Sequence, residues 1–156
     1  MQISRNGRKL LAQWEGMRNA VYDDAAGLPT IGVGHLLTQG ELDSGTIEIN
    51  GQAVEYRHGL SDQQVLDLLA QDLVGFEKAV DKAVQVTLSQ NQFDALVSFA
   101  FNVGTGAFDK STLLKVLNKG QYDQVPGQLR RWVKAGGKTV DGLVNRREKE
   151  IALWNG

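Results

Sequence analysis

One stretch of this chain decides its fold: Trp-Glu-Gly-Met-Arg-Asn-Ala-Val-Tyr-Asp-Asp-Ala-Ala-Gly-Leu-Pro-Thr-Ile-Gly-Val-Gly-His, at residues 14–35. Its pattern predicts the end of a helix, then a short loop, then a strand spaced by glycines. Glu15 would stand at the helix end, Asp24 in the loop and Thr30 at the start of the strand. A strand that reverses beyond a helix end can place two carboxyl groups across a gap. Cleavage of an acetal needs that arrangement, with one acid protonating the leaving oxygen and the other managing a water or the cation.

This segment resembles the active-site motif of phage-type lysozymes, which are endolysins that hydrolyse bacterial peptidoglycan. In that family a glutamate on a helix, an aspartate in a loop and a threonine on a strand belong to a motif that ends in Thr-Ile-Gly-x-Gly-His. The resemblance implies that Glu15, Asp24 and Thr30 are the catalytic residues. Spacing alone leaves Asp23 and Asp24 equal, and the resemblance selects Asp24. It covers most of the chain, and residues 40–60 are the least family-like part.

The position of Glu15 at a helix end suits a general acid. Apolar residues recur at helical spacing and predict an amphipathic helix over residues 4–16. A carboxyl in the last turn meets the negative end of the helix dipole, which favours its protonated form. Burial beside Trp14 would act in the same direction. Taken alone, Glu15 is more typical of a surface residue that ends a helix, and the complete motif favours the catalytic interpretation.

Capping boxes, turn residues and hydrophobic spacing divide the rest of the chain. Asn50-Gly51 lies between alternating runs and predicts a type I′ hairpin with strands at about 46–49 and 52–56, extending a small sheet. Ser61 and Ser89 each open a capping box. We expect a loop at 22–29, a strand at 30–37, and helices at about 61–82, 89–103, 111–119, 123–134 and 141–154.

Composition excludes several classes of wall enzyme. The chain has 156 residues, enough for one domain with a sizeable core. It contains no cysteine, which excludes a cysteine-nucleophile endopeptidase, and the presence of only two histidines disfavours a zinc amidase. We expect no metal and no organic cofactor, and a monomer that does not bind nucleic acid.

Charge is distributed unevenly along the chain. Residues 21–109 hold three bases and thirteen acids, whereas residues 110–156 hold ten bases and four acids. One interpretation is a basic C-terminal surface that faces an anionic polymer. The other is a set of solvated helix faces, and the sequence leaves both open.

The first residues do not resemble a targeting segment. Arg5, Arg8 and Lys9 are followed by no long apolar run. We therefore expect no secretory signal, no membrane anchor and no stable membrane insertion. A wall enzyme of this kind would be made in the cytoplasm of the host bacterium and reach the wall through a separate pore.

Two residues are expected to bind the substrate. Gly32 and Gly34 lack side chains, so a backbone or ligand can approach them closely. We expect Gly32 to contact the substrate. Asn102 matches a family amide that faces the sugar cleft. The alternative for Asn102 is an ordinary polar residue near a helix end.

Three further residues are expected to support the site. His35 and Asp72 match a histidine–aspartate pair that lies near the catalytic residues and transfers no proton. His35 could alternatively be a packed or surface imidazole. Arg146 matches an arginine that pairs with the catalytic glutamate, here Glu15. Without the resemblance, the Arg146-Arg147 doublet would be interpreted as solvated charge.

Together these features predict an α+β, lysozyme-like fold with one domain over residues 1–156. A small N-terminal lobe with a short antiparallel sheet, at about 15–60, would be joined by a connecting helix at 61–82 to a helical lobe. That lobe would contain residues 83–156 and the N-terminal helix 4–16, with the cleft between the lobes. The implied function is hydrolysis of the β-1,4 bond between N-acetylmuramic acid and N-acetylglucosamine in peptidoglycan, with inversion, for host-cell lysis.

Two alternatives belong to other functional classes. A lytic transglycosylase needs the acid but not an aspartate that holds a water. A non-catalytic peptidoglycan-binding module would keep the fold without the chemistry. The presence of Asp24 and Thr30 together with Glu15 favours hydrolysis over both.

Overall fold

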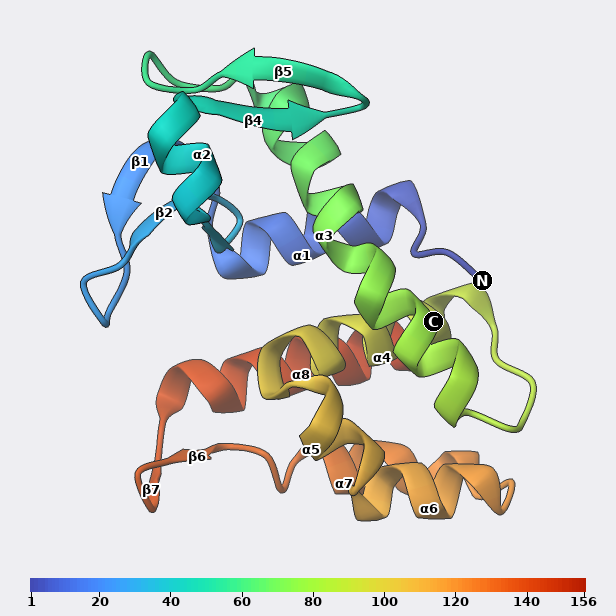
Figure 1. Ribbon diagram of the computed structural model, residues 1–156. Coiled ribbons are helices and arrows are strands. Elements are labelled where there is room, and N and C mark those ends of the chain that lie inside the picture. The colour runs from blue at the N-terminus through green and yellow to red at the C-terminus, as the bar shows by residue number, and fades with distance from the viewer. The chain divides into compact units, whose positions relative to one another are not determined.

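The computed structural model describes residues 1–156 and contains helices with three small antiparallel sheets, so the predicted α+β class is confirmed (Figure 1). The chain divides into two compact units, which are described separately. One unit comprises Arg8–Leu73, and the other comprises Met1–Gly7 with Val74–Gly156. We call them the sheet unit and the helical unit. The boundaries fall inside the first and the longest helix, each of which carries residues of both units.

The secondary structure follows the chain in a simple order. The helices are α1 (Arg5–Glu15), α2 (Gln39–Ser44), α3 (Asp62–Ala83), α4 (Gln90–Val103), α5 (Thr105–Asp109), α6 (Thr112–Asn118), η1 (Tyr122–Gln124), α7 (Val125–Leu129) and α8 (Asp141–Trp154). The strands are β1 (Arg18–Asp23), β2 (Pro29–Gly32), β3 (His35–Leu36), β4 (Thr46–Ile49), β5 (Gln52–Glu55), β6 (Lys134–Ala135) and β7 (Lys138–Thr139).

Helix α1 confirms the predicted first helix to within one residue at each end. Its start is capped by Ser4, whose hydroxyl accepts the N–H of Gly7 at 2.9 Å and donates to the buried carboxylate of Asp94. At its end, Gly16 adopts φ +87° and donates its N–H to the carbonyl of Ala12 at 2.9 Å. The helix therefore stops immediately after the candidate acid Glu15.

The first sheet differs from the prediction in two ways. Residues 18–23 form strand β1, which was not predicted, and the single strand expected at 30–37 is instead β2 and β3 joined by a turn at residues 33–34. Gly32 and Gly34 have φ +70° and +67°, which turns the chain where an extended strand was expected. Nearly every residue of β1 is exposed, so the strand carries no alternating apolar signal.

Helix α2 was also missed, although a local signal for it exists. Thr38 accepts the N–H of Glu41 at 3.1 Å, and the Glu41 carboxylate accepts the N–H of Thr38 at 2.9 Å, which is a capping box. Gly45 ends this helix in the left-handed region.

The predicted type I′ hairpin is confirmed as β4 and β5. Asn50 and Gly51 adopt φ +54° and +78° between strands paired from Thr46–Glu55 to Ile49–Gln52. The hairpin is a sheet of its own and does not extend the first sheet, because its edge is held by helix α3. The amide of Gln71 donates to the carbonyl of Glu48 at 2.9 Å and accepts the N–H of Asn50 at 2.7 Å.

Helix α3 begins and ends within a residue of its prediction. Ser61 and Gln64 form the expected capping box, with hydrogen bonds of 2.9 and 3.1 Å. Val65, Leu69 and Leu73 on this helix are fully buried. The helix has 22 residues and is about 33 Å long.

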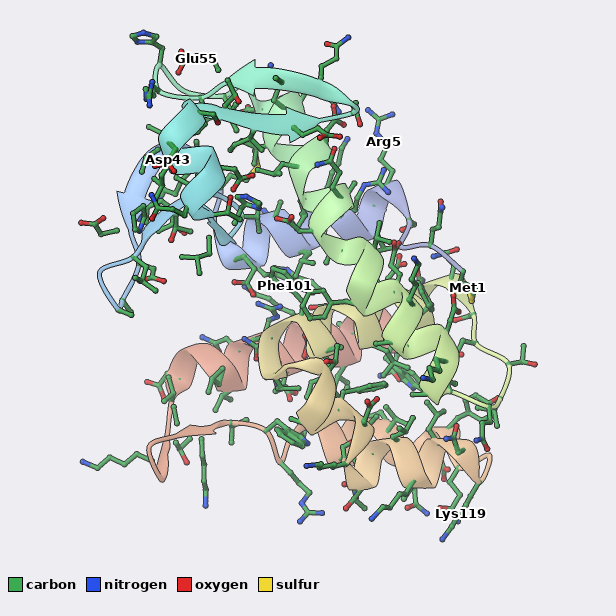
Figure 2. The ribbon with its side chains drawn as sticks, viewed as in Figure 1. Met1, Arg5, Asp43, Glu55, Phe101 and Lys119 are labelled. Carbon is green, nitrogen blue, oxygen red and sulfur yellow. The ribbon has the colours of Figure 1, made fainter.

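Helix α4 forms the core of the helical unit. It starts at the Ser89–Gln92 capping box and ends at Gly104. The rings of Phe76 on α3 and Phe101 on α4 meet edge to face at 5.2 Å (Phe101 is labelled in Figure 2). The buried side chains of α4 that face the core include Phe93, Leu96, Val97, Phe99 and Ala100.

The C-terminal part confirms some predictions and corrects others. Helices α6 and α8 lie where they were expected, and Ser111 caps α6. The helix expected at 123–134 is only η1 and α7, which ends at Leu129, and residues 134–139 form the β6–β7 hairpin. Its two central glycines have φ +59° and +80° and form the turn. No helix of the chain is long and apolar enough to cross a membrane.

Replacing Asn50 and Gly51 together by valine should destabilise the sheet unit. Both positions need positive φ, which costs a β-branched residue about 1–2 kcal/mol each, and the hydrogen bond from Asn50 to Asp67 would be lost. We expect thermal unfolding to begin several degrees lower. The control replaces the exposed strand residues Glu48 and Gln52 by valine. An unchanged melting curve for the turn variant would show that the turn does not constrain this hairpin.

Candidate active site

Glu15 is the last residue of α1 and is exposed, while the indole of Trp14 is half-buried. The expected burial of the carboxyl beside Trp14 is therefore not present. Strand β1 begins at Arg18, so the chain reverses immediately beyond the helix end (Figure 1). An exposed carboxyl at this position is accessible to a polymeric substrate.

Asp24 closes the loop between β1 and β2 with its own carboxylate. Its Oδ1 accepts the backbone N–H of Ala26 at 2.8 Å and that of Leu28 at 2.9 Å. In the same loop, the N–H of Asp24 donates to the carbonyl of Leu28, and the N–H of Gly27 donates to the carbonyl of Asp24, both at 2.9 Å. These bonds fix one oxygen of a half-buried carboxylate, while Oδ2 accepts none from the protein. The adjacent Asp23 is exposed and ends β1.

Thr30 lies on the central strand of the sheet, where it pairs with Tyr22 and Leu36. Only 2% of it is exposed. Its hydroxyl donates to the carbonyl of Leu28 at 2.9 Å, which leaves the Oγ1 lone pairs as acceptors.

The backbone of Leu28 thus joins the two candidate residues. Its carbonyl accepts from the N–H of Asp24 and from the hydroxyl of Thr30, and its N–H donates to the Asp24 carboxylate. Leu28 was not among the predicted site residues, because its contribution comes from backbone atoms. The local sequence signal for this loop is Asp24 four residues before Leu28, which is followed by Pro29. Aspartate side chains in turns often accept hydrogen bonds from nearby backbone N–H groups.

Gly32 is buried in the sheet unit. A Cβ there would lie 3.6 Å from Val65 and 3.7 Å from Leu68, which is ordinary contact. Its positive φ of +70° therefore accounts for the glycine at this position. Contact between Gly32 and a substrate stays a prediction.

His35 pairs with Asp72 as predicted, and with a second carboxylate as well. Its Nδ1 lies 2.8 Å from Oδ2 of Asp72, and its Nε2 lies 3.0 Å from Oε1 of Glu41. The hydrogen bond to Asp72 is the main cause that raises the pKa of His35 to about 9; burial opposes it and Glu41 adds to it. The imidazole is therefore protonated at neutral pH and links β3 to α2 and α3.

Glu41 was not identified from the sequence, although its capping box was visible there. Burial raises the pKa of its carboxyl, but the N–H of Thr38 and the imidazole of His35 together lower it below its usual value. No group of three or more histidine, aspartate or glutamate side chains is arranged to hold a metal ion.

A second polar cluster lies inside the helical unit. Arg146 and Arg147 are 7% and 1% exposed, so the interpretation of this doublet as solvated charge is wrong. Arg146 donates to Glu150 at 3.1 Å and to the carbonyl of Ser98 at 3.2 Å. The pairing of Arg146 with Glu15 stays a prediction.

Asn102 is exposed at the C-terminal end of α4. Its Oδ1 accepts a hydrogen bond from the guanidinium of Arg147. Neither Arg147 nor Glu150 was predicted to be functional, although an arginine three residues before a glutamate on a helix predicts an ion pair.

Replacing His35 by glutamine should destabilise the protein mainly at low pH. The folded-state pKa of about 9 exceeds the ordinary 6.5, so the stabilisation is complete below about pH 6 and is lost as pH rises through 9. We expect the free energy of unfolding to fall by about 2–3 kcal/mol at about pH 6 and by much less at about pH 10. Urea unfolding measures both values, and the exposed His58→Gln is the control. An equal loss at both pH values would exclude the charged imidazole as the cause.

The chain is similar to known proteins along nearly its whole length. A family model described as phage lysozyme matches residues 12–150. The endolysin of Salmonella phage P22 is 40% identical over 154 residues, which cover 99% of this chain and 98% of that protein. A crystal structure of P22 lysozyme gives a TM-score of 0.84 at 38% identity, covering 100% of this chain and 99% of that one.

The endolysin of Bacillus phage PZA is 41% identical over 160 residues, covering 99% of this chain but 55% of that protein. The chain therefore spans about half the length of its Bacillus phage relatives. The likeness to P22 lysozyme confirms the predicted lysozyme-like fold. Sequence and structure thus agree over nearly the whole chain, which belongs to the phage lysozyme family.

Proposed function

We propose that this chain is a muramidase that hydrolyses the β-1,4 bond between N-acetylmuramic acid and N-acetylglucosamine in peptidoglycan. The observation that carries the proposal is the rigid pairing of Asp24 with Thr30 through the backbone of Leu28. That pair leaves one carboxylate oxygen and one hydroxyl oxygen able to accept hydrogen bonds. Both belong to the sheet unit, which also contains the exposed Glu15.

In this mechanism Glu15 protonates the glycosidic oxygen as the bond to the anomeric carbon breaks. Oδ2 of Asp24 and Oγ1 of Thr30 accept hydrogen bonds from one water and direct its oxygen at the anomeric carbon. The carboxylate also stabilises the positive charge that develops there, and it accepts the proton that the water loses as the new C–O bond forms. Attack by water from the face opposite the leaving group inverts the configuration, which requires carboxyl groups about 6.5–9.5 Å apart.

The remaining candidate residues would act on these groups. Arg146 would orient Glu15, and Gly32 and Asn102 would contact the glycan. The pair of His35 with Asp72 would support the site without transferring a proton. Since His35 is protonated and bonded at both ring nitrogens, it has no lone pair with which to act as a base.

The proposed biological role is that of a phage endolysin, which acts on the wall as a monomer without a cofactor. Relatives are named endolysin or SAR-endolysin, and the latter name belongs to a protein of Escherichia phage Mu. Synthesis in the host cytoplasm and release through a separate pore complete the proposal. The excess of bases in residues 110–156 is compatible with an anionic polymer as substrate.

Replacing Glu15 by glutamine should abolish turnover without unfolding the protein. The amide cannot deliver a proton, so we expect cleavage of purified peptidoglycan to fall by about 10²-fold or more. Glu48→Gln, on an exposed strand position, is the matched control and should retain full activity. Near-normal cleavage by Glu15→Gln, with an unchanged circular dichroism spectrum, would remove Glu15 from the mechanism.

Replacing Asp24 by asparagine separates hydrolysis from transglycosylation. A hydrolase should lose most of its activity, because its water is no longer held by a carboxylate, whereas Asp23→Asn should cleave normally. Mass spectrometry of the released fragments supplies the second measurement. Hydrolysis yields reducing ends, and a transglycosylase yields anhydro sugars lighter by one water. Anhydro products, together with an active Asp24→Asn variant, would establish the alternative.

A further inference from the structure

The helical unit buries an ion pair behind an exposed amide. Glu150 is 0% exposed, and both of its oxygens are used: Oε1 accepts from Arg147 at 2.7 Å, and Oε2 accepts from the Ser98 hydroxyl at 2.6 Å and from Arg146 at 3.1 Å. Removing one partner of such a pair costs several kcal/mol. The pair is thus held in one arrangement by complete satisfaction of the carboxylate.

Hydrogen bonds and an aromatic contact hold the guanidinium of Arg147 in place. Its Nε donates to the carbonyl of Trp132 at 2.9 Å, and its guanidinium carbon lies 5.1 Å from the centre of the Phe99 ring. One terminal nitrogen donates to Glu150 and the other donates to Asn102. These contacts prevent the planar guanidinium from rotating. The N–H group that bonds Asn102 therefore has a fixed direction.

The contact decides which way the amide of Asn102 points. Arginine only donates hydrogen bonds, so the Asn102 atom that faces it must be Oδ1. The amide oxygen is engaged at the buried side, and the Nδ2 group is the atom that can donate elsewhere. Because Asn102 itself is exposed, its amide can offer this donor to a ligand at the surface.

We infer that Arg147 is a positioning residue, held by Glu150, that fixes Asn102 as a hydrogen-bond donor to the glycan. The inference rests on the proposed function, in which Asn102 contacts the substrate. The groups that Asn102 would bind are acceptors, namely the acetamido carbonyl, ring or hydroxyl oxygens of the amino sugars. An amide oriented in this way offers only its N–H donors to the ligand. A freely rotating amide could offer either its oxygen or its nitrogen.

The experiment measures binding without cleavage. In the Glu15→Gln background, the dissociation constant of a soluble, uncrosslinked peptidoglycan glycan fragment is determined by calorimetry. Asn102→Asp keeps an acceptor for Arg147 but has no donor. Arg147→Lys keeps the charge beside Glu150 but cannot reach Glu150 and Asn102 together. Thermal melts of each variant check folding, and Arg147→Met, which leaves Glu150 paired with Arg146, replaces Arg147→Lys if the latter unfolds.

We expect Asn102→Asp and Arg147→Lys each to weaken binding about 3- to 10-fold, the value of one hydrogen bond. The double variant should bind no more weakly than Asn102→Asp alone, since both changes remove the same contact. A purely structural arginine would lower the melting temperature without moving the dissociation constant in this non-additive way. Unchanged binding by Asn102→Asp, or full additivity of the two changes, would overturn the inference.

The outcomes separate this inference from the proposed function. If the wild type leaves peptidoglycan intact while the Glu15→Gln variants still show the non-additive pattern, the chemistry is wrong and the positioning role stands. If the wild type cleaves peptidoglycan and the variants bind like their parent, the positioning role is wrong and the chemistry stands. If a folded Glu15→Gln protein does not bind the fragment at all, the inference is overturned.

Discussion

The carboxylate of Asp24 holds its own loop closed, and the geometry of the sheet unit at the candidate site depends on this. The N–H groups of Ala26 and Leu28 lie at an exposed turn, and both donate to the side chain of Asp24 instead of to water. The same bonds fix the carboxylate relative to Thr30 through Leu28. One interaction therefore shapes the turn and orients the group proposed to hold a water.

Protonated His35 likewise fixes neighbouring elements of the sheet unit relative to one another. It bridges Glu41 on α2 and Asp72 on α3, and the oxygen of Glu41 that it contacts also caps the start of α2. A short helix of six residues is marginal alone, so its position depends on this tertiary contact. In our proposal the histidine stabilises the surroundings of the catalytic residues and takes no part in the chemistry.

The helical unit, by contrast, contains charged side chains that are buried and fully paired. Glu150 satisfies two arginines and a serine hydroxyl, so none of these polar groups lacks a partner in the core. Such a cluster adds less stability than an apolar core but specifies one arrangement, because any shift would leave a buried charge unpaired. In our proposal that rigidity is what orients Asn102.

Local signals in the sequence were enough to predict most helices and the Asn50-Gly51 turn, whereas the three residues proposed for catalysis came from the family resemblance. Capping boxes at Ser61 and Ser89 act within four residues, and a type I′ turn depends on two adjacent residues, so the sequence alone specifies them. The His35–Asp72 contact came from the family resemblance, since a contact across the fold has no local pattern.

Only the tertiary structure decided the rest. Strand β1 is exposed along its length and exists because β2 pairs with it, and α7 ends early because the chain forms the β6–β7 hairpin beyond it. The burial of Arg146 and Arg147 likewise needs Glu150 and Ser98 from two packed helices. Propensity and spacing report only neighbours in sequence, whereas strand pairing and burial of charge depend on partners brought together by folding.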